Sequence, residues 1–159
     1  GEAALRGMVA AGVAGAARVV DLFAGAGTFS LPLARGAEVH AVEGEAAMLA
    51  ALDRGWRNAP GLKRVTTEAR DLFRRPLLPD ELDRYDAIVI DPPRAGAEAQ
   101  MHEIARSKVR RVAAVSCNPV SFARDSRLLQ EAGFRIETLR VIDQFRWSTH
   151  IELAAIFAR

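Results

Sequence analysis

The sequence predicts an α/β fold in which a mostly parallel sheet is covered by helices on both faces. Short β-branched runs alternate with helical stretches along most of the 159 residues, and this alternation is typical of parallel sheets. The last two runs, 134–142 and 150–157, are separated by about seven residues. This link is too short for a helix, so we expect these two strands to pair antiparallel.

The first half of the chain contains three of the expected strands. In chain order we predict a lead-in helix, a strand, a glycine loop, a helix, a strand and a helix, at 2–12, 18–23, 24–28, 29–35, 37–42 and about 45–58. The dipeptide Pro60-Gly61 ends the last of these helices. A weaker strand is expected at 65–68, and Pro76 and Pro79 mark a loop.

The second half completes a seven-stranded sheet. Residues 87–90 are apolar on both faces, as a central parallel strand should be. A loop and a helix to about 106 follow, then a strand at 109–116 and a helix at 120–132 that Gly133 ends. We expect residues 1–159 to form one domain, with ligands bound beyond the carboxyl ends of its strands.

The composition limits which partners and which kinds of site the chain can have. Lys and Arg number 22 against 20 acids, a net charge of +2 that permits an RNA partner without arguing for one. The basic cluster at 106–111 fits either a solvated helix end or a phosphate contact. The single cysteine excludes a disulfide within the chain and a cysteine-ligated cluster, and the three histidines lie far apart, so we expect no metal. No run approaches the roughly 20 apolar residues of a membrane helix, and we expect a soluble cytoplasmic protein.

A nucleoside site is indicated after the first two strands. Gly25 and Gly27 allow a sharp turn and close approach of a ligand. Glu43 follows Gly27 by 16 residues and can accept both hydroxyls of a ribose, while Asp71 is placed to face an adenine edge. Two glycines alone also fit an ordinary turn. Ser30 stands where a dinucleotide motif usually has its third small residue, so NAD is not excluded.

Three further segments carry candidate chemistry. Two prolines after Asp91 fix this acid at the end of the fourth strand, although a stiff helix-capping loop is an alternative. Cys117 precedes a helix that Asn118 can cap, and the positive helix end favours a nucleophilic thiolate; otherwise Cys117 is a small core residue. Glu152 interrupts an apolar strand, either as a general base or as part of an outward face. His150 shares that face, as a substrate contact or as a structural residue.

The segments DLFAGAGTFSLPLA, DPPRAG and SCNP, with Asp143, Phe145, His150 and Glu152 at the end, resemble the RNA uracil-5-methyltransferases. That family includes the bacterial enzymes that make 5-methyluridine in 23S ribosomal RNA and in transfer RNA. The resemblance implies a class I methyltransferase fold, S-adenosylmethionine as cofactor, and RNA as partner, ribosomal rather than transfer RNA. It implies Cys117 as nucleophile and Glu152 as proton acceptor. The implied cofactor contacts are Phe23, Gly25, Gly27, Thr28, Glu43, Asp71 and Asp91, and the implied substrate contacts are Asp91, Arg94, Asn118 and His150.

The sequence departs from this family in two respects. Arg146 and Ser148 stand where the family often has Pro and Thr. Family members are usually two to three times longer, with an RNA-binding barrel and a middle domain before the catalytic domain. We therefore expect this chain to be a catalytic fragment that binds RNA weakly by itself. The alternatives are an RNA cytosine-5 or exocyclic-amine methyltransferase, an NAD-dependent oxidoreductase, and a module without catalytic activity.

Overall fold

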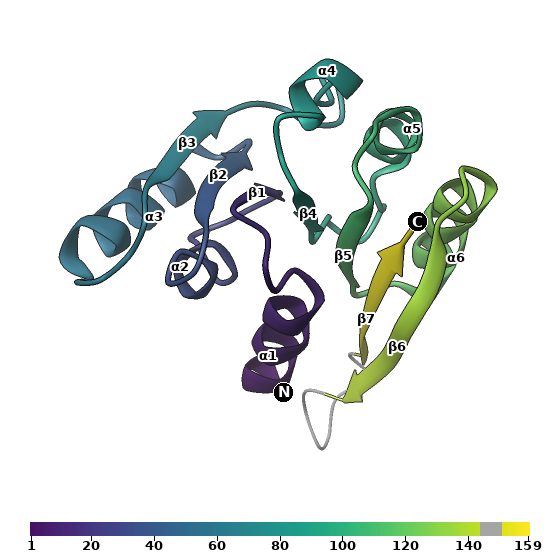
Figure 1. Ribbon diagram of the computed structural model, residues 1–159, viewed down its shortest axis with the longest axis horizontal. Coiled ribbons are helices and arrows are strands. Elements are labelled where there is room, and N and C mark those ends of the chain that lie inside the picture. Colours follow the sequence, from purple (N-terminus) through teal and green to yellow (C-terminus); the bar gives the residue numbers. More distant parts are fainter. Residues whose placement is uncertain (144–150) are drawn as a thin grey trace.

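Seven strands form one sheet in the order β3-β2-β1-β4-β5-β7-β6 (Figure 1). The computed structural model describes residues 1–143 and 151–159, so the predicted contact His150, with Phe145, Arg146 and Ser148, lies outside the described residues. The strands are β1 (Arg18–Leu22), β2 (Glu38–Glu43), β3 (Val65–Ala69), β4 (Ala87–Ile90), β5 (Arg111–Ser116), β6 (Arg135–Asp143) and β7 (Ile151–Ala158).

The pairing confirms a mostly parallel sheet with an antiparallel last strand. β1 pairs parallel with β2 and β4, β2 with β3, and β4 with β5. β7 inserts between β5 and β6 and runs antiparallel to both. The amino end of β7 therefore lies at the same edge of the sheet as the carboxyl ends of the other strands.

Helices cover both faces, as predicted. One face packs against α1 (Glu2–Gly12), α2 (Ser30–Leu33) and α3 (Ala46–Asn58), and the other against α4 (Pro79–Leu82), α5 (Glu98–Arg106) and α6 (Pro119–Glu131). Two buried apolar clusters result, because alternate strand residues face opposite sides of the sheet. Val19 and Ala113 belong to the first cluster, whereas Val20 and Val112 belong to the second.

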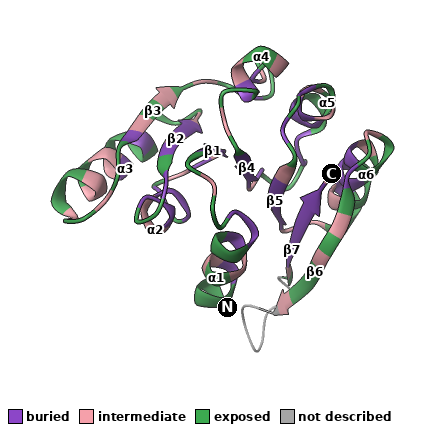
Figure 2. Cartoon of the chain, in the orientation of Figure 1, coloured by how far each residue is buried: buried purple, intermediate pink, exposed green. Residues whose placement is uncertain are grey.

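Burial follows the position of each strand in the sheet. All four residues of β4 are buried, whereas the edge strand β6 is largely exposed (Figure 2). No helix among the described residues combines the length and apolar character that crossing a membrane requires.

Three elements depart from the prediction by more than a shift of one residue. Pro79, predicted in a loop, begins the one-turn helix α4, because proline needs no amide donor at the first helical position. The helix predicted at 29–35 is a single turn, α2. β5 begins at Arg111 and not at 109, because the Ser107 hydroxyl accepts the Val109 amide at 3.2 Å and holds that segment in a turn.

Candidate active site

The turn after β1 begins the carboxyl edge of the sheet. Phe23 has a φ of 61°, which is uncommon for a residue other than glycine, and Gly25 and Gly27 follow at 58° and 99°. A Cβ on Gly25 would meet nothing within 4 Å, so a ligand can approach this backbone closely. A Cβ on Gly27 would lie 3.0 Å from Leu52 Cγ and 3.1 Å from Leu31 Cγ. Gly27 therefore serves the packing of α2 and α3 against the turn.

Glu43, at the end of β2, has a fixed carboxylate. Its Oε1 accepts the Gly25 amide at 3.1 Å, and its Oε2 accepts the Glu45 amide at 2.9 Å. A carboxylate offers about four lone-pair positions, so each oxygen can still accept another hydrogen bond. This geometry suits the two adjacent hydroxyls of a ribose.

Asp71 shapes the turn after β3. Its Oδ1 accepts the amides of Phe73 at 3.0 Å and Arg74 at 3.3 Å. Phe73 is 50% exposed, and its ring centroid lies 5.3 Å from that of Phe23 with the planes at 53°. The two rings form an apolar wall beside the carboxylates of Glu43 and Asp71.

A cleft of about 560 Å³ lies between these turns. Five residues predicted to contact the cofactor line it: Phe23, Gly25, Glu43, Asp71 and Asp91. Gly27 is buried in the turn and Thr28 is exposed. Neither lines this cleft, so their contact with a cofactor stays a prediction.

Several lining residues were not predicted from the sequence, among them Met48, Arg70 and Phe73. Arg70 and Phe73 lie within two positions of Asp71, and this proximity was a usable signal. Met48 lies in α3, where its place beside the cleft depends on how the helix packs.

Arg70 holds the loop that carries Asp71. Its guanidinium donates to both carboxylate oxygens of Glu81, at 2.8 and 3.1 Å, to the Arg75 carbonyl at 2.7 Å and to the Pro76 carbonyl at 2.8 Å. The hydrogen bond from Arg70 lowers the pKa of Glu81, and the bond to Glu81 raises the pKa of Arg70. The loop from 71 to 76 is therefore folded around one cation.

Asp21 is a buried carboxyl that the sequence analysis did not assign. Burial raises its pKa to about 7, although the Ser30 hydroxyl donates to its Oδ2 at 2.6 Å and opposes the shift. Its Oδ1 has no hydrogen-bond partner among the described residues. The signal was present in the sequence, because Asp21 interrupts an apolar strand directly before the glycine turn.

Asp91 ends β4 at the floor of the cleft. Burial raises the pKa of Asp91 to about 7, and the negative charges of Glu152 and then Asp21 add to the shift. Ionising neighbouring carboxyls together in a buried site is unfavourable, which is why these charges raise the pKa of Asp91 further.

The loop after Asp91 packs tightly against α6. Gly96 has a φ of 79°, and a Cβ there would lie 2.6 Å from an Arg124 guanidinium nitrogen and 2.8 Å from Asp125 Oδ2. The same Asp125 oxygen accepts the Ala97 amide at 2.8 Å, and Arg124 donates to the Ala95 carbonyl at 2.9 Å. The glycine of the DPPRAG segment is thus required by packing.

The Ser116–Pro119 turn is joined to that loop through Asn118. The side-chain oxygen of Asn118 accepts the Val120 amide at 3.1 Å and caps α6, and its amide nitrogen donates to the Arg94 carbonyl at 3.0 Å. The Ser121 hydroxyl donates to the same carbonyl at 2.9 Å. Both polar ends of the Asn118 side chain therefore have partners within the protein. Arg94 contributes its backbone here, and its side chain is exposed.

Cys117 and Glu152 lie at neighbouring strand ends. The antiparallel register of β5 and β7 ends with Ser116 opposite Leu153, so Cys117 and Glu152 are the next residues along the two chains. Cys117 is a half-buried free thiol, and Glu152 is also half-buried. The described part of the chain contains no group of three His, Cys, Asp or Glu side chains arranged for a metal ion.

Known proteins match this chain in sequence and in fold. Residues 58–159 match the family model of tRNA (uracil-5-)-methyltransferases. An uncharacterised RNA methyltransferase of Brucella suis is 56% identical over 158 residues, which are 99% of this chain and 38% of that protein. A 23S rRNA (uracil(1939)-C(5))-methyltransferase of a Shewanella species is 43% identical over 141 residues, 88% of this chain and 31% of that protein.

A solved structure also matches nearly the whole of this chain. The Pyrococcus abyssi tRNA (uracil-54, C5)-methyltransferase, solved in complex with S-adenosyl-L-homocysteine, superposes with a TM-score of 0.84 at 28% identity. The match covers 99% of this chain and 38% of the archaeal protein. The chain therefore spans well under half of the length of these relatives. The fold is that of class I methyltransferases.

Proposed function

The chain belongs to the tRNA (uracil-5-)-methyltransferase family, and we propose that it forms the catalytic domain of an S-adenosylmethionine-dependent enzyme that methylates carbon 5 of a uridine in RNA. One observation carries the proposal. The register of β5 and β7 supports it, because Ser116 and Leu153 form the last pair and Cys117 and Glu152 are the next residues along the two chains, at the carboxyl edge of the parallel strands. A thiol and a carboxylate are the two groups that this reaction requires.

The cleft fits the proposed cofactor. The open backbone at Gly25 admits an amino acid moiety, the fixed carboxylate of Glu43 matches a ribose diol, and the wall of Phe23 and Phe73 suits an adenine ring. S-adenosylmethionine would supply a methyl group made electrophilic by its sulfonium.

Cys117 makes the uracil reactive. Carbon 5 of uracil is a poor nucleophile, so the thiolate first adds to carbon 6, and the electron pair of the 5,6 double bond moves onto carbon 5. Cys117 lies two residues before Pro119, where α6 begins. After carbon 5 is methylated, Glu152 removes its proton, the double bond reforms and the carbon–sulfur bond breaks. The target base must be unstacked to reach this site.

Asp91 lies close enough to the proposed base for their charges to interact. Burial raises the pKa of Asp91 to about 7, and the charge of Glu152 adds to the shift. We assign Glu152, and not Asp91, as the group that accepts the proton of carbon 5.

The RNA partner is proposed as ribosomal RNA. The relative with 43% identity is named for 23S rRNA, whereas the structural relative named for tRNA has 28% identity. Selection of the uridine depends on the shape of the RNA around it.

A covalent trap tests the proposed reaction. Fluorine at carbon 5 cannot leave as a proton, so an RNA stem-loop containing 5-fluorouracil should stall as a protein–RNA adduct when S-adenosylmethionine is present. Intact mass spectrometry should detect the adduct in the native chain and not in Cys117→Ala, which should still bind the cofactor. A matching stem-loop with 5-fluorocytosine distinguishes a cytosine-5 enzyme. An adduct that persists in Cys117→Ala would exclude the mechanism, and failure to bind the cofactor would exclude the proposed class.

A further inference from the structure

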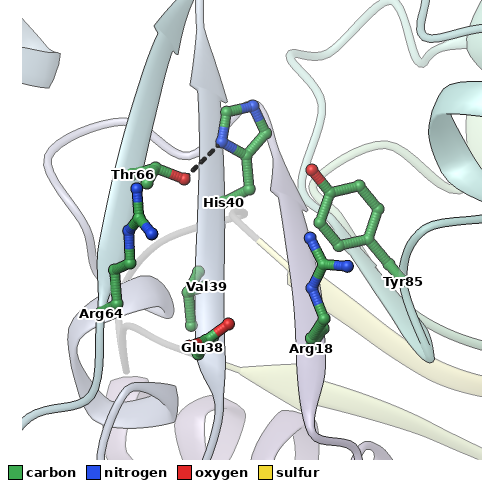
Figure 3. Close-up of a pocket in the computed structure, with 7 residues that line it drawn as sticks. All are labelled: Arg18, Glu38, Val39, His40, Arg64, Thr66 and Tyr85. Carbon is green, nitrogen blue, oxygen red and sulfur yellow. Dashed lines mark hydrogen bonds between the residues drawn. The ribbon is translucent and has the colours of Figure 1, made fainter.

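A second cavity lies away from the cleft, near the amino ends of the first strands. It has a volume of about 180 Å³ and is lined by Arg18, Glu38, Val39, His40, Arg64, Thr66 and Tyr85 (Figure 3). The connection from β3 to β4 contains only the one-turn helix α4. The polar residues of β2 and β3 that point to this side therefore remain accessible beside the cavity.

Two arginines of the cavity are uncommitted. Arg18 pairs with Glu38 across β1 and β2, and the Arg64 carbonyl accepts the amide of Val39, the residue after Glu38. Neither guanidinium makes an ion pair or hydrogen bond within residues 1–143 and 151–159. Figure 3 shows both side chains extending past Glu38 toward the level of His40, one on each side of the central strand.

The backbone spacing of these arginines suits one shared anion. Neighbouring strands lie about 4.8 Å apart, so the Arg18 and Arg64 backbones are separated by about 10 Å. Guanidinium groups approaching from both sides can each donate two hydrogen bonds to a tetrahedral oxyanion.

The nearby acids leave a positive balance. Glu68 contacts His40 at 2.9 Å and Arg70 at 3.2 Å, and Asp86 accepts the amides of residues 17 and 18, each at 3.0 Å. Glu38 is the one acid among the residues that line the cavity, and its side chain has no hydrogen bond or ion pair within the described residues. The lining therefore contains two arginines and one acid, with the His40 ring beside them.

The remaining wall is rigid and aromatic. The Arg18 guanidinium lies 5.4 Å from the centre of the Tyr85 ring, and the rings of His40 and Tyr85 are nearly parallel, at 7°, with centroids 6.1 Å apart. His40 Nδ1 is 2.7 Å from the Thr66 hydroxyl oxygen. Arg18 is thus held by stacking while its hydrogen-bond donors stay available.

We propose that Arg18 and Arg64 hold a backbone phosphate of the RNA substrate in this cavity. This inference rests on the proposed function, because it takes RNA as the substrate. The chain His40–Glu68–Arg70 joins the cavity to the cofactor cleft through consecutive hydrogen bonds. Four residues of β1 separate the two sites, about 13 Å. A stacked strand rises about 3.4 Å per nucleotide, so the distance between the cavity and the cofactor cleft corresponds to roughly four nucleotides.

The basic cluster at 106–111 is less suited to this contact. Arg106 pairs with Glu103 at 3.3 Å, and Arg111 binds Glu137 at 2.9 Å and the Gly12 carbonyl at 2.9 Å. These two arginines already have partners within the protein, which supports the structural interpretation of the cluster.

The test compares two double variants of equal charge change. Arg18→Gln/Arg64→Gln removes the proposed phosphate contact. Arg35→Gln/Arg54→Gln removes two exposed arginines of the opposite, helix-covered side, which have no side-chain partner among the described residues. The dissociation constant of a labelled uridine-containing oligoribonucleotide is measured over a tenfold range of salt for the native chain and both variants.

We expect the first variant to bind the RNA about tenfold more weakly at low salt. Its slope of log affinity against log salt should be shallower by about 0.7, the contribution of one phosphate on a single strand. The control should change neither value by as much. Arg18→Lys/Arg64→Lys, which keeps the charge, should recover most of the salt slope. Thermal unfolding verifies that each variant is folded.

Other results would overturn the inference. Equal slopes of log affinity against log salt in the first variant and the control would refute it. A native chain that does not bind the oligoribonucleotide would also refute it. Inorganic phosphate is also added to the native chain while the Nε signals of Arg18 and Arg64 are followed by NMR. If these signals shift but the salt slope of RNA binding is unchanged in the first variant, the cavity binds a free anion and not the RNA. Cofactor binding and the 5-fluorouracil trap report on the proposed function separately, so a positive trap with equal slopes refutes the phosphate contact alone.

Discussion

Replacing Gly96 with alanine should destabilise the protein more than replacing Gly133, and the difference measures how tightly the DPPRAG loop packs against α6. Both glycines have positive φ, 79° and 100°. Each alanine therefore carries the left-handed backbone penalty of about 1–2 kcal/mol. A Cβ on Gly133 would meet nothing within 4 Å, so this penalty is the whole expected effect there.

Gly96→Ala adds a steric conflict. The new Cβ would lie 2.6 Å from the flexible end of Arg124, but also 2.8 Å from Asp125 Oδ2 and 3.0 Å from Ser121 Cβ. Asp125 cannot withdraw easily, because it is buried and accepts the Ala97 amide at 2.8 Å. Overpacking of this kind costs about 1–3 kcal/mol, in addition to the backbone penalty. We expect a loss of about 2–5 kcal/mol for Gly96→Ala against about 1–2 kcal/mol for Gly133→Ala.

Urea unfolding followed by circular dichroism measures both losses. The slope of free energy against urea should stay unchanged, because neither substitution alters the surface exposed on unfolding. Equal losses in the two variants would refute the packing explanation for the glycine of DPPRAG. At a temperature where both variants are folded, methyl transfer should fall further in Gly96→Ala, since its displaced loop carries Asp91 and the Arg94 carbonyl.

Three other perturbations follow from the site. In Asp21→Asn, we expect the part of the pH dependence of stability that is due to Asp21 to vanish. The pKa of Asp21 in the native protein is raised from 3.8 to about 7, so its contribution to the free energy of unfolding is greatest below pH 4 and falls by up to about 4 kcal/mol as the pH rises through 7. Unfolding free energies of both proteins at pH 5 and pH 8 check this, and the same difference between the two pH values in the variant as in the native protein contradicts it. Arg70→Gln should weaken cofactor binding about tenfold by freeing the loop of Asp71, measured by calorimetry, whereas Arg57→Gln, an exposed ion pair, should leave binding unchanged. Asn118→Asp keeps the acceptor that caps α6 but loses the donor to the Arg94 carbonyl. The rate of methyl transfer should therefore fall, while the free energy of unfolding changes by under about 1 kcal/mol. A variant that transfers methyl groups at the native rate would show that the hydrogen bond to Arg94 is dispensable.

The sequence was sufficient for what depends on local pattern. Apolar β-branched runs predicted the strands to within about two residues, and the carboxyl-end rule for parallel sheets placed Glu43, Asp71 and Asp91 at one edge before any coordinates were known. Asn118 and Pro119 predicted the start of α6 for the same reason, since capping is a matter of adjacent residues.

Features that depend on tertiary packing were not predictable. The role of Gly27 depends on leucines 4 and 25 residues away, and Arg70 is recognisable as a loop anchor only once Glu81 lies beside it. Pro79 has two ordinary uses, in a loop or at a helix start, and sequence alone did not separate them. The pairing of Arg18 with Arg64 requires the parallel order of β1, β2 and β3.

The antiparallel β7 connects the fold to the proposed chemistry. In an all-parallel sheet, a residue near the start of the last strand lies at the edge opposite the cofactor, and Glu152 is only the second residue of β7. Because β7 runs against β5, its amino end meets the carboxyl end of β5, where Cys117 follows Ser116. A shift of one residue in this register would turn Glu152 to the other face of the sheet. The buried pairing of Val112 with Phe157 and Ala114 with Ala155 therefore fixes the position of Glu152, the proposed base, as well as the core.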